Sequence, residues 1–294
     1  MLSEGWRTVV ITSKITLRME KNNLLLIKDD KIDRIPLEHI KIIIFDSNSV
    51  SLSSGTISCL CKWGIKLLFC NEKHNPLSET IVFDDNAFSA GRLFEQINWK
   101  NDYKLNVWKK IIDNKVKNQY RLAAKTDEKR ASAILEMLSN INDSNVNDIE
   151  ANAARIYFKI IFGRGFNRRT ESNINSALNY GYAIIMSLIN KSVVAHGYNT
   201  ALGINHCSIK NPFNLSCDLI EPFRPVVDAI VYINKGRDLD FDYKRELIEL
   251  LNKEVKYNEH RTELQNAIEC FVQDVLKELS DGNARIGEIN FAEM

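Results

Sequence analysis

The sequence predicts an α+β protein, with a small β-sandwich-like domain in residues 1–84 and a larger all-α-helical domain in residues 85–294. Up to residue 83, apolar and polar residues alternate in short runs, which is typical of strands. Beyond Asp84 the apolar residues recur with a period of about 3.6, which is typical of helices. A chain of 294 residues is long enough to bury a core in each domain.

Strands are expected in several runs of the N-terminal domain. Val, Ile, Leu and Phe dominate these runs, and Asn, Asp, Gly and Ser separate them, as strand ends and turns require. Residues 28–31 predict a hairpin turn. One helix interrupts the strands, with Ser54 as its cap and Gly64 at its end. The predicted strands are 7–12, 15–19, 24–28, 40–46, 65–70 and 80–83.

Helices are expected almost throughout the C-terminal domain. The clearest apolar stripe at helical spacing runs from Leu264 to Leu279. The other predicted helices are 87–99, 103–124, 128–138, 146–162, 171–194 and 247–255.

The composition excludes several classes of protein. With 45% hydrophobic and 26% charged residues, the chain is not disordered as a whole. Its six cysteines are too few for a disulfide scaffold and lack the usual spacing of a zinc site. No apolar run approaches the roughly 20 residues that span a bilayer, and the N-terminus lacks the apolar centre of a secretory signal. We therefore expect a soluble, cytoplasmic protein with no membrane partner.

The net charge of +1 conceals an asymmetry along the chain. Residues 92–169 contain sixteen Lys and Arg against nine Asp and Glu, whereas residues 235–294 contain nine against fourteen. A basic middle beside an acidic tail suggests a surface that faces a polyanion. Ordinary charged helix faces explain the same asymmetry equally well.

Glu150 lies on the apolar stripe of a predicted helix, in phase with Tyr157 and Ile161. An unpaired carboxylate on such a face costs free energy, so Glu150 needs a cation, a set of donors or a metal. The alternative is a glutamate near the helix start, placed favourably at the helix dipole.

The loop that follows the 171–194 helix carries two histidines. His196 precedes Gly197 and fits a helix C-terminus, which is a structural role. His206 lies in a connection rich in Gly, Asn and Ser, where no helix explains it. His206 is therefore the better candidate for a ligand or a proton-handling residue.

Asp218 and Glu221 lie three residues apart in a segment where Asn211 and Pro212 predict a helix start. This spacing puts both carboxylates on one side of a helical turn, where they repel each other. A divalent cation would relieve the repulsion, and oxygen ligands suit Mg²⁺ or Mn²⁺, with an added imidazole favouring Mn²⁺. A solvated acidic helix start explains the same spacing without a site.

Basic residues form two further candidate surfaces. Arg164, Arg168 and Arg169 follow the Glu150 helix in a glycine-containing turn. Lysines and tryptophans interleave between Trp99 and Arg121. Such surfaces hold phosphates electrostatically without reading sequence. For the lysine run, solvated helix faces remain the competing interpretation.

Taken together, these stretches resemble the CRISPR-associated endonuclease and integrase family of spacer acquisition, the "Cas-one" proteins. The resemblance rests on EANAARIYF at 150–158, NSALNYGYAIIMSLI at 175–189, GINH at 203–206 and NLSCDLIEPFRPVVD at 214–228. The opening GWRTVVITSKITL and SSGTISCLCKWGIKLLF at 53–69 resemble the type II members in particular. The resemblance covers essentially the whole chain.

The resemblance implies a catalytic metal site with Glu150, His206 and Glu221 as ligands and Asp218 as a supporting acid. It implies that the C-terminal domain holds this site and binds DNA, with Arg164, Arg168 and Arg169 as the candidates, while the N-terminal domain serves dimerisation. The expected activity is that of an endonuclease and integrase dependent on Mg²⁺ or Mn²⁺. In antiviral defence it would insert protospacer DNA into a CRISPR array by transesterification.

The partners implied by the resemblance are a second copy of the chain and the small "Cas-two" protein, within a larger integration complex. Double-stranded DNA with single-stranded 3′ ends is the implied substrate, and other type II adaptation proteins are further candidate partners. The competing function is a non-enzymatic DNA-binding scaffold, which has no use for two carboxylates and a histidine. A zinc hydrolase is disfavoured, because only His206, Cys207 and Cys217 are near one another.

Overall fold

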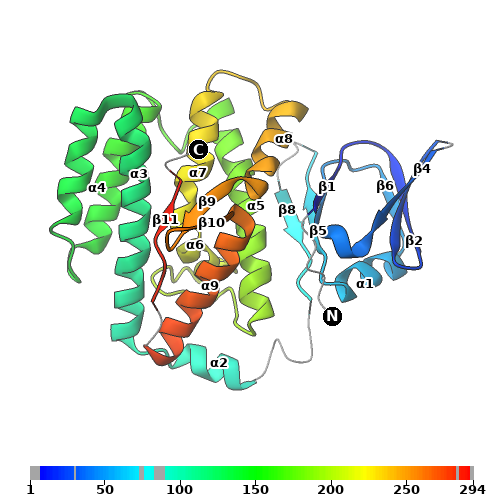
Figure 1. The fold of residues 1–294 in the computed structure, drawn as a ribbon, viewed down its shortest axis with the longest axis horizontal. Helices are drawn as coiled ribbons and strands as arrows, with labels where there is room; N and C mark the ends of the chain where they lie inside the picture. Colours follow the sequence, from blue (N-terminus) through cyan, green and yellow to red (C-terminus); the bar gives the residue numbers. More distant parts are fainter. Residues whose placement is uncertain (1–6, 30, 73–75, 83–89, 283–284, 292–294) are drawn as a thin grey trace. The chain divides into compact units, whose positions relative to one another are not determined.

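The computed structural model describes residues 7–29, 31–72, 76–82, 90–282 and 285–291 (Figure 1). The chain divides into two compact units, residues 1–84 and 85–294. Strands dominate the first unit and helices dominate the second, so the predicted α+β class is confirmed.

The N-terminal unit contains two sheets. Its strands are β1 (Arg7–Ile11), β2 (Ile15–Glu20), β3 (Asn23–Lys28), β4 (Lys31–Pro36), β5 (Ile40–Phe45), β6 (Val50–Leu52), β7 (Lys66–Cys70) and β8 (Pro76–Glu79). In the described residues the strand order is β1-β5-β7-β8 in one sheet and β4-β3-β2-β6 in the other. The predicted strand 80–83 is wrong for residues 80–82, because the last strand of this unit ends at Glu79. Residue 83 lies outside the described residues.

The pairing within these sheets follows the apolar pattern. In the first sheet β5 lies between β1 and β7, and all three run parallel, with Val10 opposite Ile44 and Ile44 opposite Leu68. In the second sheet β3 and β4 form an antiparallel hairpin in which Lys28 pairs with Lys31. This pairing confirms the predicted turn, of which residue 30 lies outside the described residues.

One helix, α1 (Ser54–Lys62), packs with both sheets around a common apolar core. Its N-cap is Ser53, whose hydroxyl accepts a hydrogen bond from the backbone N–H of Thr56, so the predicted cap was one residue too late. Gly64 follows the helix with φ +69°, as the predicted helix end requires.

The C-terminal unit is mainly helical. Its helices are α2 (Ala90–Ile97), α3 (Asn101–Leu138), α4 (Val146–Ile161), α5 (Asn173–Ala195), α6 (Asn214–Leu219), η2 (Glu221–Phe223), α7 (Arg224–Ile233), α8 (Phe241–Glu249), η3 (Leu250–Asn252) and α9 (Leu264–Asp281). Residues 87–89 of the predicted helix 87–99 lie outside the described residues. The predicted helix start at Asn211 and Pro212 is wrong, because α6 begins at Asn214.

A small sheet in this unit contradicts the prediction of an all-helical domain. Strand β9 (Glu254–Tyr257) pairs with β10 (His260–Glu263) and with β11 (Ile289–Asn290). The connecting residues Asn258 and Glu259 have positive φ, as a two-residue hairpin turn of the primed type requires. These strands are short and polar, so their alternation was too weak to be recognised, and β9 overlaps the predicted helix 247–255.

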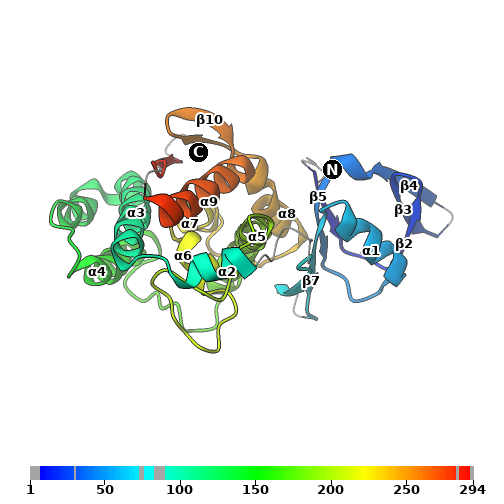
Figure 2. The same cartoon turned by 90° about the horizontal axis from the view of Figure 1, so that it is seen from below.

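Helices α3 and α4 lie side by side (Figures 1 and 2). The sequence predicted two helices where α3 stands, and the structure joins them across a break at Asp127, whose φ of −155° is not helical. The Asp127 carboxylate accepts a hydrogen bond from the Arg130 backbone N–H at 3.0 Å and so caps the second half of the helix.

Helix α5 runs through the middle of the C-terminal unit and packs against α6, α7, α8 and α9 (Figure 2). In the described residues no helix, α5 included, is long and apolar enough to cross a membrane. Gly181 permits the close approach of α7 to α5, because a Cβ at this position would lie 2.5 Å from Val227 Cγ1.

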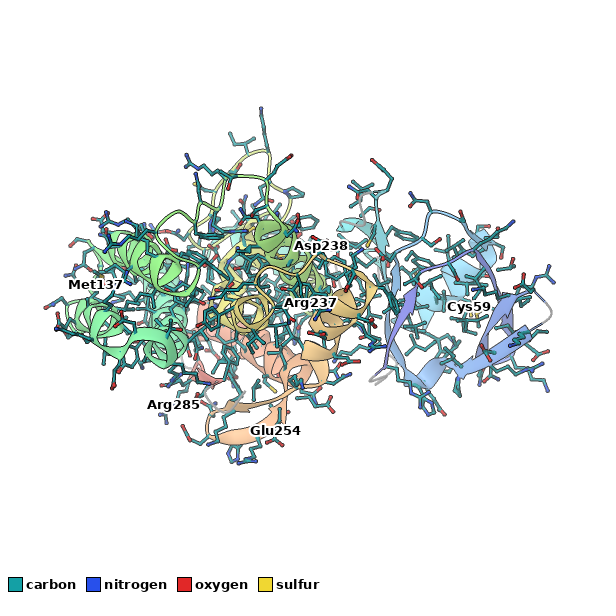
Figure 3. The ribbon with its side chains drawn as sticks, turned by 90° about the horizontal axis from the view of Figure 1, so that it is seen from above. Cys59, Met137, Arg237, Asp238, Glu254 and Arg285 are labelled. Carbon is teal, nitrogen blue, oxygen red and sulfur yellow. The ribbon has the colours of Figure 1, made fainter. Side chains whose placement is uncertain are left out.

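The loop between α7 and α8 is tied to its surroundings by Arg237 and Asp238, which Figure 3 labels. The Arg237 guanidinium pairs with Glu246 at 2.9 Å and stacks over the ring of Tyr243. Asp238 accepts a hydrogen bond from the side chain of Asn173 at 2.5 Å. The beginning of α5 is thereby fixed to the loop that precedes α8.

Gly181→Ala tests the close approach of α5 and α7. Alanine gains roughly 1 kcal/mol of helix propensity, but the stiff Val227 side chain must move, and such overpacking costs roughly 1–3 kcal/mol. We expect a net loss in the free energy of unfolding of about 1 kcal/mol, measured by denaturant unfolding. Gly165→Ala is the matched control, since a Cβ there meets no atom within 4 Å. Equal stability of the two variants would contradict this packing.

Candidate active site

Lys115 of α3 stands between two of the carboxylates that the sequence singled out. Its Nζ contacts Glu150 Oε1 on α4 and lies 2.5 Å from Glu221 Oε2 at the start of η2. The side chains of Lys115 and Glu221 are 6% and 7% exposed, and that of Glu150 is 29% exposed. The carboxylate on the apolar stripe of α4 is therefore compensated by a cation.

Arg224 supplies Glu221 with a second cation. The Arg224 Nε donates a hydrogen bond to Glu221 Oε1 at 2.8 Å. Burial raises the pKa of Glu221, but the charges of Arg224 and Lys115 outweigh it and lower the pKa to about 2. Burial lowers the pKa of Lys115, but the charges of Glu221 and Glu150 outweigh it and leave the pKa raised. Lys115 and Glu221 are thus both ionised at neutral pH.

Asp218 is fully buried and directs both carboxylate oxygens at the loop that carries His206. Oδ2 accepts hydrogen bonds from the backbone N–H groups of Ile204 at 2.6 Å and Asn205 at 3.1 Å. Oδ1 accepts from the His206 backbone N–H at 3.0 Å and lies 2.6 Å from the ring Nδ1. These contacts fix the orientation of the imidazole.

The surroundings of His206 raise the pKa of its imidazole. The hydrogen bond to Asp218 raises the pKa of His206, burial lowers it by less, and the charges of Asp218 and Glu221 raise it further. The ring also packs edge-on against Trp108 of α3, with centroids 6.1 Å apart.

Asp218 and Glu221 do not form the repelling pair expected from their spacing. Helix α6 ends at Leu219 and the chain tightens into η2, so the two carboxylates reach different partners. Asp218 binds the backbone of the His206 loop, and Glu221 binds Lys115 and Arg224. The expected repulsion, which a shared divalent cation would relieve, is therefore wrong, and so is the alternative of a solvated acidic helix start, because both residues are buried.

The His206 loop can close on Asp218 because residue 203 is a glycine. A Cβ on Gly203 would lie 2.2 Å from the His206 carbonyl oxygen and 2.9 Å from Asp218 Oδ2. The buried Gln96 of α2 fixes the same loop, since its amide donates to the carbonyl of Leu202 at 2.9 Å. The Asn214 amide donates to the Ser208 carbonyl at 2.8 Å. The sequence pattern had singled out neither Gln96 nor Asn214.

The residues present fit a hard divalent cation. Glu221 Oε2 is buried and faces the Lys115 ammonium at 2.5 Å, so it already holds a cation. Glu150 adds a second carboxylate, and oxygen donors suit Mg²⁺ and Mn²⁺. His206 engages Asp218 through Nδ1, which leaves Nε2 without a partner in the described residues, an arrangement typical of metal-binding histidines.

The candidate ligands are not assembled around a common point. Among the described residues, no three His, Cys, Asp or Glu side chains lie close enough to hold a metal. The structure brings Glu150 and Glu221 together at Lys115, and it brings His206 to Asp218. The assignment of Glu150, His206 and Glu221 as a metal triad therefore stays a prediction.

A buried hydrogen-bond network of Tyr182, Asp228 and Tyr157 packs against Arg224. The Arg224 guanidinium lies 4.6 Å from the ring centroid of Tyr182 on α5. The Tyr182 hydroxyl donates to Asp228 on α7, and the Tyr157 hydroxyl on α4 donates to the same carboxylate at 2.8 Å. Burial raises the pKa of Asp228 to about 6, although both tyrosine hydrogen bonds lower it. Through Tyr157 the network returns to α4, the helix that carries Glu150.

The three arginines proposed for DNA binding differ in their surroundings. Arg168 donates hydrogen bonds to Asn175 at 2.5 Å and Asn179 at 2.8 Å, and its guanidinium lies over Tyr182. Arg164 and Arg169 are exposed, and neither side chain has a partner among the described residues. Arg168 therefore serves the fold, and the two exposed arginines are the ones available to phosphates.

The lysine and tryptophan run on α3 is not one open surface. Trp99, Trp108 and Lys115 are buried. Lys109 pairs with Asp143 at 2.6 Å and Lys110 with Glu278 at 2.8 Å. Part of the run is therefore used in the fold, whereas Lys100 and Lys104 form no ion pair in the described residues, so the interpretation of the run as a phosphate-binding face stays a prediction.

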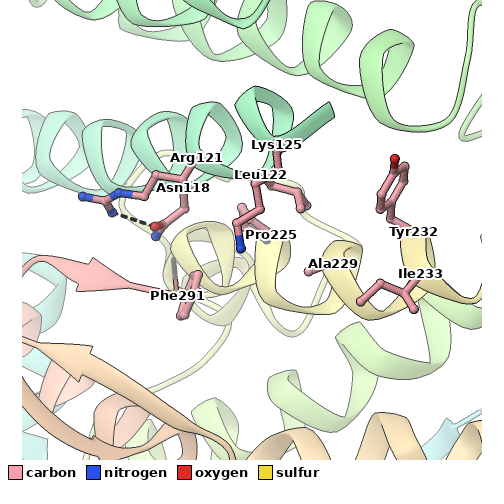
Figure 4. Close-up of a pocket in the computed structure, with 9 residues that line it drawn as sticks. All are labelled: Asn118, Arg121, Leu122, Lys125, Pro225, Ala229, Tyr232, Ile233 and Phe291. Atoms are coloured by element: carbon pink, nitrogen blue, oxygen red, sulfur yellow. Dashed lines mark hydrogen bonds between the residues drawn. The ribbon is translucent and has the colours of Figure 1, made fainter. Parts of the chain in front are cut away.

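A pocket of about 130 Å³ lies between α3 and α7 (Figure 4). Asn118 and Leu122 line it from α3, three and seven residues beyond Lys115 and thus on the same helix face. Pro225, directly after Arg224, lines the opposite side. The pocket therefore lies on the face of α3 that carries Lys115, but on a different face of α7 from Arg224, because consecutive helical residues do not share a face.

Comparison with known proteins identifies the family. Residues 8–259 match the family model described as CRISPR associated protein Cas1, so this chain belongs to the Cas1 family. It is 29% identical over 286 residues to the CRISPR-associated endonuclease Cas1 of Neisseria meningitidis serogroup C (strain 8013), covering 95% of this chain and 94% of the relative. The expected family is thereby confirmed, whereas the type II assignment stays a prediction.

Solved structures share the fold. A Cas1 protein from Thermotoga maritima superposes with a TM-score of 0.77 at 16% identity, over 95% of this chain and 98% of that one. A casposase bound to integration product gives 0.75 at 18% identity, over 96% of this chain and 92% of that one. A Cas6-RT-Cas1–Cas2 complex gives 0.73 at 17% identity, over 98% of this chain and 37% of that one. At these identities the likeness concerns the fold.

The raised pKa of Asp228 predicts a particular pH dependence. Between about pH 4 and 6 the folded state holds a proton on Asp228 that the unfolded state has released, so this group's contribution to stability falls as pH rises. Asp228→Asn removes that contribution. We expect the free energy of unfolding of the variant, relative to that of the wild type, to rise by about 1–3 kcal/mol as the pH increases from 4 to 7. Denaturant unfolding across this range provides the measurement, and parallel profiles would contradict the assignment.

Proposed function

We propose that this chain is a DNA endonuclease and integrase that depends on Mg²⁺ or Mn²⁺ and inserts protospacer DNA into a CRISPR array. The observation that carries the proposal is the convergence of Glu150 and Glu221 on Lys115, together with an imidazole oriented by Asp218, which lies three residues before Glu221. Membership of the Cas1 family, a relative named as an endonuclease and a casposase neighbour bound to integration product support it.

In this proposal Glu150, Glu221 and the Nε2 of His206 would hold the cation, with Lys115 displaced. The cation would polarise the scissile phosphate and stabilise the leaving 3′ oxygen, either in hydrolysis or in attack by a 3′-hydroxyl. Asp218 orients the imidazole through Nδ1, which in this proposal leaves Nε2 for the cation. Arg224 holds Glu221 in place, and its own position is fixed by the Tyr182 ring.

We further propose that the chain acts as a homodimer with the Cas2 protein, on double-stranded DNA with single-stranded 3′ ends. The fold shared with a chain of a Cas6-RT-Cas1–Cas2 complex supports the Cas2 partner. Dimerisation through the N-terminal unit, the type II partners and a cytoplasmic location follow from the family resemblance and belong to the same proposal.

The metal assignment is tested with Glu150→Gln and His206→Ala. Both side chains are partly exposed, so either change should leave the fold intact. We expect each variant to lose DNA cleavage and strand transfer. Mn²⁺ at about 100 times its dissociation constant should stabilise the wild type by roughly 2.7 kcal/mol, and either variant by much less. Thermal unfolding with Mn²⁺ and with chelator measures this difference.

Two outcomes would contradict the metal assignment. One is wild-type cleavage in the presence of chelator, which would remove the need for a metal. The other is an equal stabilisation of wild type and variants by Mn²⁺, which would place the metal elsewhere. If the wild type and the variants all bind DNA but none of them cleaves or joins it, the scaffold function is favoured.

The DNA-binding proposal separates Arg164 and Arg169 from Arg168. Removing one bond to a phosphate lowers the slope of log K against log salt by about 0.9 on duplex DNA. We expect Arg164→Ala and Arg169→Ala to lower the slope and leave stability unchanged. Arg168→Ala should lower the melting temperature, because Asn175 and Asn179 lose their partner. DNA affinity measured from 50 to 200 mM salt tests this, and an unchanged slope in the Arg164→Ala/Arg169→Ala double variant would exclude the turn from the DNA path.

A further inference from the structure

The Lys115 ammonium occupies the position between the carboxylates at which the proposed function puts a divalent cation. It contacts Glu150 and lies 2.5 Å from Glu221, and its side chain is 6% exposed. A lysine that served only to attract phosphate would present its charge to solvent. Lys115 instead directs its charge inward, toward the two proposed ligands.

The local charge count explains why the lysine matters. Lys115 and Arg224 carry two positive charges, and Glu150 and Glu221 carry two negative charges, so the four groups together are neutral. A divalent cation that enters a neutral cluster gains little electrostatic attraction, and it must also displace the ammonium from both oxygens. Without Lys115 the cluster carries one net negative charge and its carboxylates are open.

The same lysine supports the fold when metal is absent. Glu221 is buried with a 7% exposed side chain, and a buried charge that loses a partner is strongly destabilising. Glu150 projects from the apolar stripe of α4 and has no other ion-pair partner in the described residues. Lys115 therefore joins α3 to both α4 and η2.

We propose that Lys115 is a resident counter-cation that holds the two carboxylates together in the metal-free protein and competes with the divalent metal for them. The inference rests on the metal site of the proposed function. Lys115 thereby stabilises the metal-free fold and weakens metal binding.

The test compares Lys115→Met with the wild type in two measurements that do not involve catalysis. In chelator, we expect the melting temperature of Lys115→Met to fall by roughly 5–10 °C, because the carboxylates lose their shared cation. Mn²⁺ binding, followed by the electron paramagnetic resonance signal of free Mn²⁺, should be at least about tenfold tighter than in the wild type. Saturating Mn²⁺ should restore most of the decrease in melting temperature.

Lys110→Met is the matched control. Lys110 lies on the same helix and pairs with the buried carboxylate of Glu278 at 2.8 Å, away from the proposed ligands. We expect Lys110→Met to leave the Mn²⁺ affinity at the wild-type value. Wild-type or weaker Mn²⁺ affinity in Lys115→Met would overturn the competition between lysine and metal.

If Lys115→Met does not fold, the double variant Lys115→Met/Glu150→Gln tests the proposal instead. It removes one positive and one negative charge, so we expect its melting temperature in chelator to return toward that of the wild type. A double variant that is as unstable as Lys115→Met would overturn the counter-cation role. The single variant Glu150→Gln tests the metal site separately. If its Mn²⁺ affinity equals that of the wild type, the metal site is overturned, and with it the proposed function.

Discussion

Lys115 neutralises two carboxylates from distant parts of the sequence, the partly exposed Glu150 and the buried Glu221, and the packing of α3 against α4 and η2 depends on this. Lys115 contacts both Glu150 and Glu221, so α3 is held in register with α4 and with η2. Arg224 supplies the balancing charge and rests on Tyr182, which donates to Asp228. Because buried charges are tolerated only when paired, any change that separates these elements exposes an uncompensated charge.

The imidazole is positioned by a second set of contacts, in which backbone N–H groups donate to the Asp218 carboxylate. Asp218 accepts hydrogen bonds from three backbone N–H groups of the loop and contacts the ring of His206. The loop therefore adopts its shape around one buried carboxylate. Gly203 leaves the space that this closure needs. The site therefore combines a histidine oriented by Asp218 with a carboxylate pair held by the Lys115 ammonium, the cation that we propose a divalent metal displaces.

The sequence predicted the α+β class and most helices, because their apolar periodicity is strong. It also indicated that Glu150 needs a cation and that His206 has no helical reason for its position. It missed the sheet β9–β11, whose strands are short and polar, and it misjudged Asp218 and Glu221, because helical spacing does not reveal where a helix tightens into a 3-10 turn. No local pattern separates Lys115 from the other lysines of α3, since its role depends on contacts with residues far away in the sequence.

The proposed site requires that Glu150, His206 and Glu221 converge on one divalent cation once Lys115 moves aside. Anomalous diffraction from crystals of the wild-type protein soaked in Mn²⁺ tests it most directly. We expect a single strong peak in the C-terminal unit, within about 2.0–2.4 Å of oxygens of Glu150 and Glu221 and of Nε2 of His206, with the Lys115 ammonium withdrawn from the carboxylates. A manganese peak elsewhere, with Lys115 still between the two glutamates, would contradict it.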